Sequence, residues 1–549
     1  MKKIVLLVFV LMLLLPMVVV IYFSAPVKAE SKIVFVDAKN TGPEDGSKEY
    51  PYNTIKEGIN AADPGYTVFV YSGTHQEWNI VLDKENFSLI GENKGGTIID
   101  GMNFGWILTI TAQNVTVSGF TIQRSSIGTA GVFLNHATKS RISDNIIRNH
   151  DSGIYSIYAN GNVIESNLVA NNNEGIILSS VCKENKIIGN CVTGNTLYAG
   201  IDLSNGAHDN EIRNNNVTQN RYGILITSEN NSISGNHITN NSVGIYEYSE
   251  STHGYRIFHN NFINNKKQVD LGNLSVNIWD DGLEGNYWSD YNGTDFNKDG
   301  IGDTQYVISG NNRDRYPLMG IFQSFNISTG YYANVISNSK IKNFEHFESN
   351  STIKLHISNS SVTQTYGFCR VCVPHTLMNP DEISVIIDDG QTPVFYHDYT
   401  LHDNGTHRWI YFAYEDSTHE VLIGDTTPPS LSILSPQNTT YNVNDVPLTF
   451  TVSESTSWIG YNLDSQTSVT VAENTTLCGL SQGLHNLIVL AKDTAGNIGA
   501  SEMIYFTIET QQDEVFQILI VAAIATIAVV VAVLLVYFAK IKKTNENVK

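Results

Sequence analysis

The sequence between residues 164 and 192 contains Ile164-Glu-Ser-Asn167-Leu-Val169 and, 23 residues later, Ile187-Ile-Gly-Asn190-Cys-Val192. The shared pattern is Ile, two residues, Asn, one residue and an apolar residue. It occurs six times, with successive Asn residues separated by 21 to 25 positions. The six Asn are Asn145, Asn167, Asn190, Asn215, Asn236 and Asn260. A repeat of this length predicts a stack of similar structural units.

A second marker, Gly followed by an apolar residue, keeps the same spacing. It is found at Gly131, Gly153, Gly175, Gly200, Gly223 and Gly244. Apolar residues alternate in short runs such as Gly223-Ile-Leu-Ile-Thr227, which is typical of strands and not of helices. Short strands at a constant period predict an all-β fold, a parallel β-helix of about ten turns, in which each turn buries its apolar face against the next.

The abundance of Asn follows from this fold. The chain has 59 Asn, and 26 of them lie between Asn145 and Asn265. An Asn at the same place in every turn can pass amide hydrogen bonds from one turn to the next inside a dry core. We therefore interpret the six repeated Asn as a structural ladder.

Length and charge exclude several classes of protein. A chain of 549 residues predicts several domains. Its 33 Lys and Arg against 54 Asp and Glu give a net charge of -21, which argues against a nucleic-acid partner because binding phosphates requires clustered basic residues. Five Cys in a chain of this size do not make a disulfide scaffold.

Both ends of the chain are apolar. Residues 1–29 have two Lys, an apolar run and the small-residue ending Val27-Lys-Ala29, which predicts a signal peptide. Residues 515–539 are uncharged and long enough to cross a membrane, and the tail 540–549 begins with Lys. Because Lys residues favour the cytoplasmic side, we expect a single-pass membrane protein with an extracellular ectodomain and a cytoplasmic C-terminus.

Three further segments are predicted between these ends. Residues 30–320 hold the β-helix, with a capping helix that carries Ile55, Ile59 and Ala62 on one face and with Thr67–Gly73 as the first strand. Residues 321–425 alternate like a β-sandwich, and residues 426–510 like an immunoglobulin-like β-sandwich.

Two stretches carry a resemblance to known proteins. Residues 50–59, Tyr-Pro-Tyr-Asn-Thr-Ile-Lys-Glu-Gly-Ile, resemble the start of right-handed β-helix proteins with the pectin-lyase-like fold. The closing motifs Gly285-Asn-Tyr-Trp-Ser-Asp-Tyr291 and Asp299-Gly-Ile-Gly-Asp303 resemble the NosD-type periplasmic copper-binding branch, also described as a carbohydrate-binding and sugar-hydrolysis domain. The resemblance covers residues 33 to 320. It implies a right-handed β-helix, but its members include both enzymes and non-catalytic surface proteins.

One motif suits a metal ion. Oxygen side chains alternate around a Gly turn at Asp295, Asn297, Asp299 and Asp303, which is the pattern that Ca²⁺ prefers. The twelfth position, where an EF-hand has a bidentate acid, is Tyr306. We expect calcium to pin this end of the β-helix.

The stacked repeat also predicts an outward-facing column, two residues after each repeat Gly. The column is Phe133, Tyr155, Ile177, Asp202, Leu225 and Tyr246. Its aromatic rings Phe133, Tyr155 and Tyr246 could stack on sugar rings or against another domain. Within the column Asp202 has apolar neighbours and no second acid for a glycosidase pair.

Two weaker catalytic arrangements remain. Asp151 and Glu174 form a diagonal acid pair in the bends before two repeat Gly residues. Asp202 with His208, Asp209 and Arg213 comes closest to the base, cation and acid that a lyase or epimerase needs. No catalytic residue is assigned from either arrangement.

Copper is not expected from the residue pattern. The β-helix His residues do not occupy matching positions in adjacent turns, as a copper site would require. They are His136, His150, His237, His253 and His259.

Cys369 and Cys372 lie three residues apart on a predicted strand and so point to opposite faces, which puts a direct bridge out of reach without a local turn. A bridge from Cys182 to Cys191 stays open.

The sequence thus favours a cell-surface protein that binds polysaccharides or cell-envelope glycans without catalysis, or has a structural or adhesive role. The alternative is a polysaccharide lyase, hydrolase or epimerase acting on uronate-type glycans. A second alternative is NosD-like copper handling.

Overall fold

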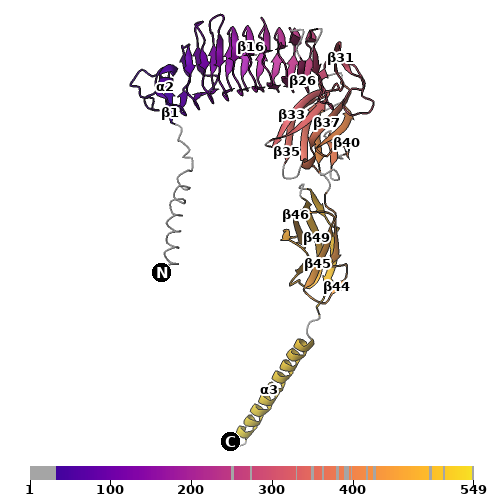
Figure 1. The fold of residues 1–549 in the computed structure, drawn as a ribbon. Coiled ribbons are helices and arrows are strands. Elements are labelled where there is room, and N and C mark those ends of the chain that lie inside the picture. The colour runs from indigo at the N-terminus through magenta and orange to yellow at the C-terminus, as the bar shows by residue number, and fades with distance from the viewer. Residues whose placement is uncertain are drawn as a thin grey trace, which may run out of the picture. The chain divides into compact units, whose positions relative to one another are not determined.

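The computed structural model describes residues 32–546 except for 249–252, 273–274, 329, 348–351, 362–363, 379–382, 389–394, 397, 416–417, 425–427, 494–496 and 511–513. The predicted signal peptide, residues 1–29, lies outside the described residues. Figure 1 shows the order of the elements along the chain.

A right-handed parallel β-helix occupies the first part of the described chain, as predicted. Its strands form three parallel sheets of eleven, nine and ten strands, so the coil makes about nine turns where the repeat predicted ten. The eleven-stranded sheet contains β1 (Ile33–Val36), β2 (Thr67–Val70), β5 (Ser88–Gly91), β8 (Thr116–Ser118), β11 (Arg141–Ser143), β14 (Val163–Glu165), β17 (Lys186–Ile188), β20 (Glu211–Arg213), β23 (Ser232–Ser234), β26 (His253–Phe258) and β29 (Val276–Ile278). The nine-stranded sheet contains β4 (Ile80–Leu82), β7 (Leu108–Ile110), β10 (Ala130–Asn135), β13 (Ser152–Ile157), β16 (Glu174–Ser179), β19 (Ala199–Leu203), β22 (Tyr222–Ile226), β25 (Val243–Glu247) and β28 (Lys267–Asp270). The ten-stranded sheet contains β3 (Gly73–His75), β6 (Thr97–Asp100), β9 (Thr121–Gln123), β12 (Ile146–Arg148), β15 (Leu168–Ala170), β18 (Cys191–Thr193), β21 (Asn216–Thr218), β24 (His237–Thr239), β27 (Asn261–Ile263) and β30 (Tyr287–Trp288).

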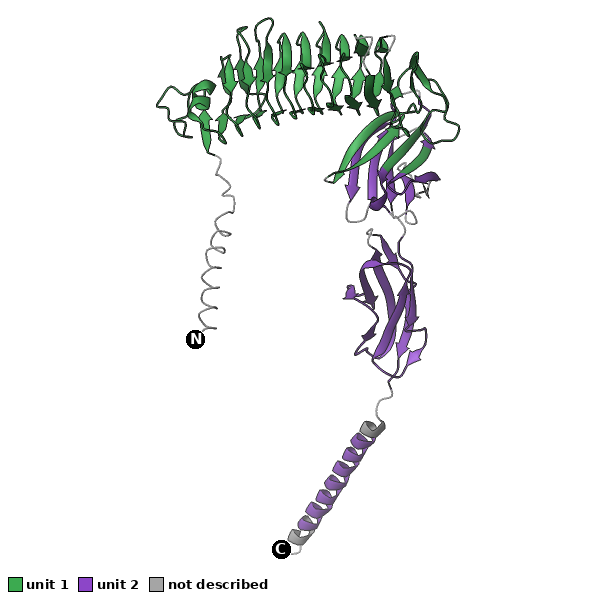
Figure 2. Ribbon diagram, viewed as in Figure 1, with its two compact units in different colours: residues 1–339, 367–372, 409–413 green, residues 340–366, 373–408, 414–549 purple. Residues whose placement is uncertain are grey.

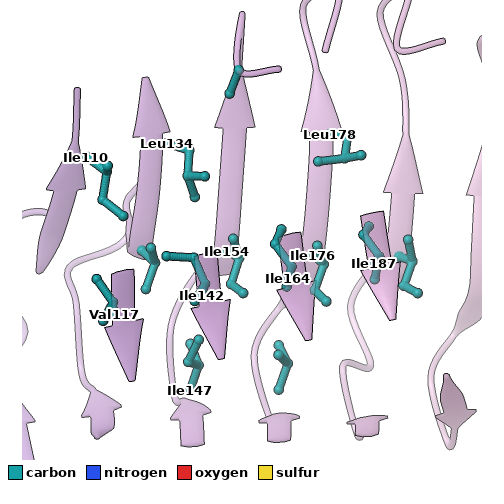
Figure 3. Packing of buried hydrophobic residues seen from close by; sticks show 14 of the residues in the cluster. Ile110, Val117, Leu134, Ile142, Ile147, Ile154, Ile164, Ile176, Leu178 and Ile187 are labelled. Atoms are coloured by element: carbon teal, nitrogen blue, oxygen red, sulfur yellow. The ribbon is translucent and has the colours of Figure 1, made fainter. Parts of the chain in front are cut away.

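The core of the β-helix is a set of aliphatic columns that run along its length. Figure 3 shows Ile142, Ile164 and Ile187 of the eleven-stranded sheet in one such column, with Ile154 and Ile176 of the nine-stranded sheet beside it. All five side chains are fully buried. Since the strands of adjacent turns pair in register, one apolar position per turn extends each column by one side chain.

The N-terminal end is covered by helix α2 (Ile55–Ala61), and Ile55, Ile59 and Ala62 are buried as predicted. Thr54 begins the helix by accepting a hydrogen bond from the Glu57 N–H. The first strand, however, is β1 and not Thr67–Gly73. The alternating segment Ile33–Val36 precedes the helix in the sequence and pairs directly with β2. The helix therefore belongs to the connection between two neighbouring strands of one sheet.

Each of the three corners of the β-helix carries a polar ladder, whereas the sequence pattern predicted a single ladder. The predicted ladder runs from Asn145 to Asn260 and continues to Asn286. A second ladder comprises Ser140, Asn162, Asn185, Asn210 and Asn231, and a third comprises His150, Asn172, Asn195, Asn220, Asn241 and Asn265. Within each turn the Asn are therefore five residues apart, a spacing that the six-residue pattern overlooked.

The repeat Gly residues are explained by close contact between turns. A Cβ atom on Gly175 would lie 2.3 Å from the Gly200 carbonyl oxygen, and one on Gly223 would lie 2.5 Å from that of Gly244. Any larger residue would force the turns apart, so Gly at this position keeps the register of the nine-stranded sheet.

The C-terminal end of the β-helix is closed by aromatic side chains and a hairpin. Trp288 stacks on Phe262 at 4.3 Å and on Tyr306 at 4.3 Å, and its indole N–H donates to Asp314 at 2.9 Å. Tyr306 and Asp314 lie on the hairpin β31 (Tyr306–Ser309) and β32 (Asn312–Asp314). Burial raises the pKa of Asp314 to about 6, although hydrogen bonds from Trp288 and Asn286 oppose the rise.

Antiparallel sheets follow the β-helix. One sheet has the order β33 (Ile321–Ser328), β34 (Tyr331–Ser337), β37 (Tyr366–Pro374), β41 (His407–Glu415) and β40 (Tyr399–Asp403). Another has the order β35 (Lys340–Phe347), β36 (Thr352–Ser358), β42 (His419–Gly424), β38 (Ser384–Asp388) and β39 (Phe395–Tyr396), and η1 (His375–Leu377) is a short helix. Cys369 and Cys372 both lie on β37, the strand on which they were predicted. None of the five Cys forms a disulfide in the described structure, so Cys182 and Cys191 are not bridged.

Two compact units divide the chain (Figure 2). The first comprises residues 1–339, 367–372 and 409–413, and the second comprises residues 340–366, 373–408 and 414–549.

In the first unit Glu284 joins the end of the β-helix to β37 and β41. It pairs with Arg370 and accepts a hydrogen bond from the Trp409 indole at 2.8 Å. Burial alone would raise the pKa of Glu284, but His259, Arg370 and Trp409 together lower it to about 2.

The second unit contains a further pair of sheets and the C-terminal helix. The sheets comprise β43 (Leu431–Ser435), β45 (Val446–Val452) and β48 (Thr475–Leu477) on one side, and β44 (Thr440–Tyr441), β51 (Ile504–Ile508), β49 (Gly483–Asp493), β46 (Thr456–Leu463) and β47 (Val469–Val471) on the other, with β50 (Ile498–Ala500) paired to β49. The immunoglobulin-like assignment of this region stays a prediction. Helix α3 (Glu514–Glu546) contains Ile518–Ile541, 24 residues with mean hydropathy 3.3, which is long and apolar enough to span a membrane.

Candidate functional site

The column predicted to face outward lies on the nine-stranded sheet, but only Phe133, Tyr155 and Tyr246 are partly exposed. Its other members, Ile177, Asp202 and Leu225, are buried. Backbone pairing places Phe133 beside Tyr155, Tyr155 beside Ile177, and Ile177 beside Asp202. Asp202 then pairs with Leu225, which pairs with Tyr246. The turns are ~4.8 Å apart, so Tyr155 and Tyr246 are separated by ~19 Å along the sheet.

Two groups of stacked aromatic rings lie on this face. In the first, Trp106 stacks on Phe133 with centroids 4.4 Å apart, and Phe133 stacks on Tyr155 at 5.6 Å. In the second, Tyr222 stacks on Tyr246 at 4.2 Å, and Tyr198 meets Tyr222 edge-on at 5.9 Å. All six side chains are at least partly exposed. We call these groups the first and second aromatic stacks.

A carboxyl pair lies between the two stacks. Glu174 is the first residue of β16, and Asp202 lies on β19, the next strand of the sheet (Figure 1). Their side chains meet diagonally, because Glu174 belongs to the row that includes Ser152 and Asp202 to the row that includes Tyr155 and Ile177. The two carboxyls lie close enough for each to shift the pKa of the other.

The surroundings keep one proton on this pair. Burial raises the pKa of Glu174 to about 9, and the charges of Asp202 and Asp151 add to the rise. Burial also raises the pKa of Asp202, to about 6, while hydrogen bonds from Glu174 and Ser204 lower it. Glu174 Oε1 and Asp202 Oδ1 are buried and have no hydrogen-bond partner among the described residues. At neutral pH the two carboxyls therefore hold one proton and one negative charge between them.

The pair is surrounded by phenols and not by cations. Burial raises the pKa of Tyr155 and of Tyr198, and the charges of Glu174 and Asp202 contribute to both rises. Among the described residues, no Lys, Arg or His contributes to the pKa shift of either carboxyl. The pair thus carries one uncompensated negative charge.

The other acid candidates are placed differently from the sequence interpretation. Asp151 is near Glu174, but its two oxygens accept hydrogen bonds from the Asn173 amide at 2.6 Å and the Gly128 N–H at 3.1 Å. Glu174 was expected in a solvated bend with Asp151 as partner. It lies instead at the start of strand β16, and the charge of Asp202 raises its pKa more than that of Asp151 does.

The proposed lyase cluster is not assembled on one face. Arg213 lies on β20 of the eleven-stranded sheet and pairs with Glu211 at 2.6 Å, whereas Asp202 lies on the nine-stranded sheet. His208 pairs with Asp209 at 2.8 Å, on the segment that leads from β19 to β20. The three groups that a lyase would need together are therefore divided between two sheets.

The Asp and Asn residues of the calcium motif form a self-bonded turn. Asp295 accepts hydrogen bonds from the N–H groups of Asp299 at 3.0 Å and Gly300 at 2.9 Å. Asp303 accepts one from the Phe296 N–H at 2.9 Å, and the Asn297 amide donates to Asp299 at 3.0 Å. Gly300 has φ +79, which explains the Gly in the motif. Calcium binding at this turn stays a prediction.

The His residues of the β-helix have separate environments. His150 is buried in the third ladder, His136 stacks on Tyr158 at 4.9 Å, and His259 bonds to Glu284 at 2.8 Å. Burial lowers the pKa of His237, while His253 is exposed at the start of β26. In the part of the chain that the structure describes, no three His, Cys, Asp or Glu side chains are grouped to hold a metal ion.

Three aromatic residues of the face were not found from the sequence. Trp106 precedes β7, Tyr198 precedes β19 and Tyr222 stands directly before the repeat Gly223. The sequence interpretation treated the position before each Gly as a bend. Reading that position as a second outward row would have found both Tyr222 and Glu174.

Comparisons with known proteins give one family match and several distant solved structures. Residues 84–293 match the family model described as "Periplasmic copper-binding protein (NosD)". Similar solved structures include pectate lyase Pel9A (13% identity, TM-score 0.36, 46% of this chain and 81% of that chain) and pectin methylesterase PemA from Erwinia chrysanthemi (11%, 0.31, 41% and 82%). XylC, solved as a complex with xylose, has 13% identity and TM-score 0.39 over 45% of this chain and 68% of its own. No curated protein shows significant similarity to this chain.

The three parallel sheets and the repeat define the first part of the chain as a parallel β-helix repeat protein. Within that class, residues 84–293 are similar to the NosD family, and this range contains the closing motif Gly285–Tyr291.

Proposed function

We propose that this chain is a membrane-anchored, carbohydrate-binding protein of the cell envelope, and that the outer face of the nine-stranded sheet binds a polysaccharide. The observation that carries the proposal is the carboxyl pair Glu174–Asp202 between two aromatic stacks. Aromatic faces pack against the apolar faces of sugar rings, and carboxylates accept hydrogen bonds from sugar hydroxyls. A face of ~19 Å offers room for several sugar units.

The charge at the pair favours an uncharged sugar there. An acidic sugar beside the negative charge of the pair would meet like charge at a buried site, which costs free energy. A hydroxyl group instead donates to the carboxylate. This argues against uronate lyase or epimerase chemistry at the pair, since such chemistry requires a nearby cation to neutralise the sugar carboxylate.

Hydrolysis of a glycosidic bond is the second candidate, because a protonated and an ionised carboxyl stand together. Glu174 would protonate the leaving oxygen while Asp202 takes a proton from the attacking water, giving two shorter glycans. The carboxyls of a glycosidase stand ~5 to 9.5 Å apart and flank the bond that they cleave. Asp202 is buried and Glu174 is only partly exposed, so hydrolysis requires both carboxyls to become accessible to the glycan, and binding has the stronger support.

Copper handling is not proposed. The family description concerns copper, but the β-helix His residues are dispersed and no metal-holding group of three is present in the described segments.

The test of the binding proposal is retention of the full chain, purified in detergent, on a panel of immobilised polysaccharides. We expect retention on at least one, weakened about fivefold by Tyr246→Ala, because one ring–ring contact contributes about 1 kcal/mol. Tyr331→Ala, on β34 and 51% exposed, is the matched control. Absence of retention on every polysaccharide would refute the proposal.

The same incubations test hydrolysis. New reducing ends that disappear in Glu174→Gln, with retention unchanged, would support it. New unsaturated ends would instead indicate a lyase. Retention without new ends of either kind would leave binding as the function of this face.

A further inference from the structure

A groove lies along one corner of the β-helix, beside the second aromatic stack. It has a volume of about 420 Å³ and runs past the turns that precede β19, β22, β25 and β28. Its lining includes Gln219, Arg221, Asn240, Ser242, Asn264 and Lys266, and no Asp or Glu is among its described lining residues.

Arg221 is held in place at the edge of this groove. One of its terminal nitrogens donates to the Leu197 carbonyl at 3.2 Å, and its guanidinium lies 5.0 Å from the centre of the Tyr222 ring. The positive charge also acts on Tyr246, the partner of Tyr222 in the stack. A guanidinium has five N–H donors, so most of the donors of Arg221 are available to a ligand.

Lys266 lines the groove from the other end and differs from its neighbour in the sequence. Lys267 pairs with Asp270 at 2.7 Å. No carboxylate lies within ion-pair distance of Lys266 in the part of the chain described. Two cations without acidic partners stand here in a protein with a net charge of -21. Such a positive site on an acidic surface attracts an anion.

We propose that this groove is a subsite for an anionic group of the bound glycan, a carboxylate or a sulfate carried by a sugar that lies against Tyr222 and Tyr246. The inference rests on the glycan-binding function proposed above. The face then has two parts. Glu174 and Asp202 take an uncharged sugar, and Arg221 and Lys266 take an acidic one, one to four turns along the coil and so up to ~19 Å away. The expected ligand is a polysaccharide that contains both kinds of sugar.

The test compares the full chain, purified in detergent, on immobilised neutral, carboxylated and sulfated polysaccharides. We expect at least one anionic polymer to bind about tenfold more tightly than the neutral ones, and added salt to reduce this advantage because it screens exposed charges. The carboxylated and sulfated arms identify the anion.

The double variant Arg221→Gln/Lys266→Gln is expected to lose the tenfold advantage while keeping its affinity for neutral polymers. Lys267→Gln is the control, because it removes one positive charge directly beside Lys266 but outside the groove. Both variants change exposed side chains, and unchanged melting curves would show that they fold. Equal binding of neutral and anionic polymers, or equal losses in the double variant and the control, would overturn the subsite but not the proposed function. Absence of any polysaccharide binding would overturn both.

Discussion

Asparagine has two separate roles in the β-helix. Ladder residues such as Asn190 are buried, and each amide bonds to the turns on both sides. Other Asn occupy the left-handed backbone region at turns, including Asn171 with φ 56 and Asn240 with φ 55. Asn is the non-glycine residue that best tolerates this region, because its side chain bonds locally. An excess of one residue type thus reflects two physical requirements.

Replacement of a ladder residue is expected to be costly. Asn190→Ala removes the acceptor of the Asn167 N–H and the donor to the Ile164 carbonyl, and both groups stay buried. Each orphaned group costs about 1–3 kcal/mol, so we expect a loss of about 3 kcal/mol in the free energy of unfolding. The urea midpoint of the β-helix measures it. Asn216→Ala, at an exposed position of the adjacent strand, should change stability by less than about 0.5 kcal/mol.

His150 should make the β-helix sensitive to acid. Burial lowers the pKa of His150 to about 4, because its ring lies inside the third ladder, with Nδ1 accepting from the Ser125 N–H and Nε2 donating to the Ile122 carbonyl. In the unfolded chain the pKa returns to about 6.5, so between these values the unfolded state binds more protons. Stability is therefore full above pH 6.5 and falls as the pH drops toward 4, by about 3 kcal/mol in total.

His150→Asn isolates this effect. The later members of the ladder are Asn and make equivalent bonds, as Asn172 does to the Ile147 carbonyl, so the variant should fold. The stability difference between the variant and the natural chain, measured at pH 7 and pH 4, should shift by about 3 kcal/mol in favour of the variant. A difference that stays constant over this range would contradict the assignment.

At the scale of elements, the contact between adjacent turns decides which side chains meet. The repeat Gly residues let β16 and β19 approach closely. Glu174, which stands directly before Gly175, then comes near Asp202, which stands two residues after Gly200. Glu174 and Asp202 are 28 residues apart in the sequence and belong to different rows. No single-column comparison finds such a pair.

The turn from Asp295 to Asp303 carries the prediction for calcium. Its carboxylates accept backbone N–H bonds, and carboxylate oxygens have remaining lone pairs for a cation. If Ca²⁺ binds here, it stabilises the folded chain according to its affinity, so EDTA should lower the melting temperature and added CaCl₂ should restore it. Asp299→Asn should reduce the response. Superimposable melting curves with and without EDTA would exclude a calcium contribution.

At the scale of the whole molecule, α3 determines where the other domains reside. Residues 518–539 are uncharged, and Lys540, Lys542 and Lys543 follow at the C-terminal end of the span. This asymmetry favours a cytoplasmic C-terminus, which would place the face proposed to bind glycans outside the cell.

Protease treatment of intact cells tests this orientation. We expect an epitope tag placed after Lys549 to be protected and the β-helix to be digested or released. A chain ending at residue 513 should leave the membrane fraction, because it lacks the apolar helix. Digestion of the C-terminal tag in intact cells would reverse the proposed topology.

The sequence by itself determined the parallel β-helix, one Asn ladder, the capping helix and the candidate membrane span. These features depend on periodicity and on apolar length, which are local properties of the chain. Tertiary structure alone decided that Glu174 meets Asp202, that Trp106, Tyr198 and Tyr222 join the aromatic stacks, and that Arg221 and Lys266 share a groove. These groupings depend on the register between turns, and the lengths of the turns, which vary from 21 to 25 residues, do not reveal which side chains meet on the outer face.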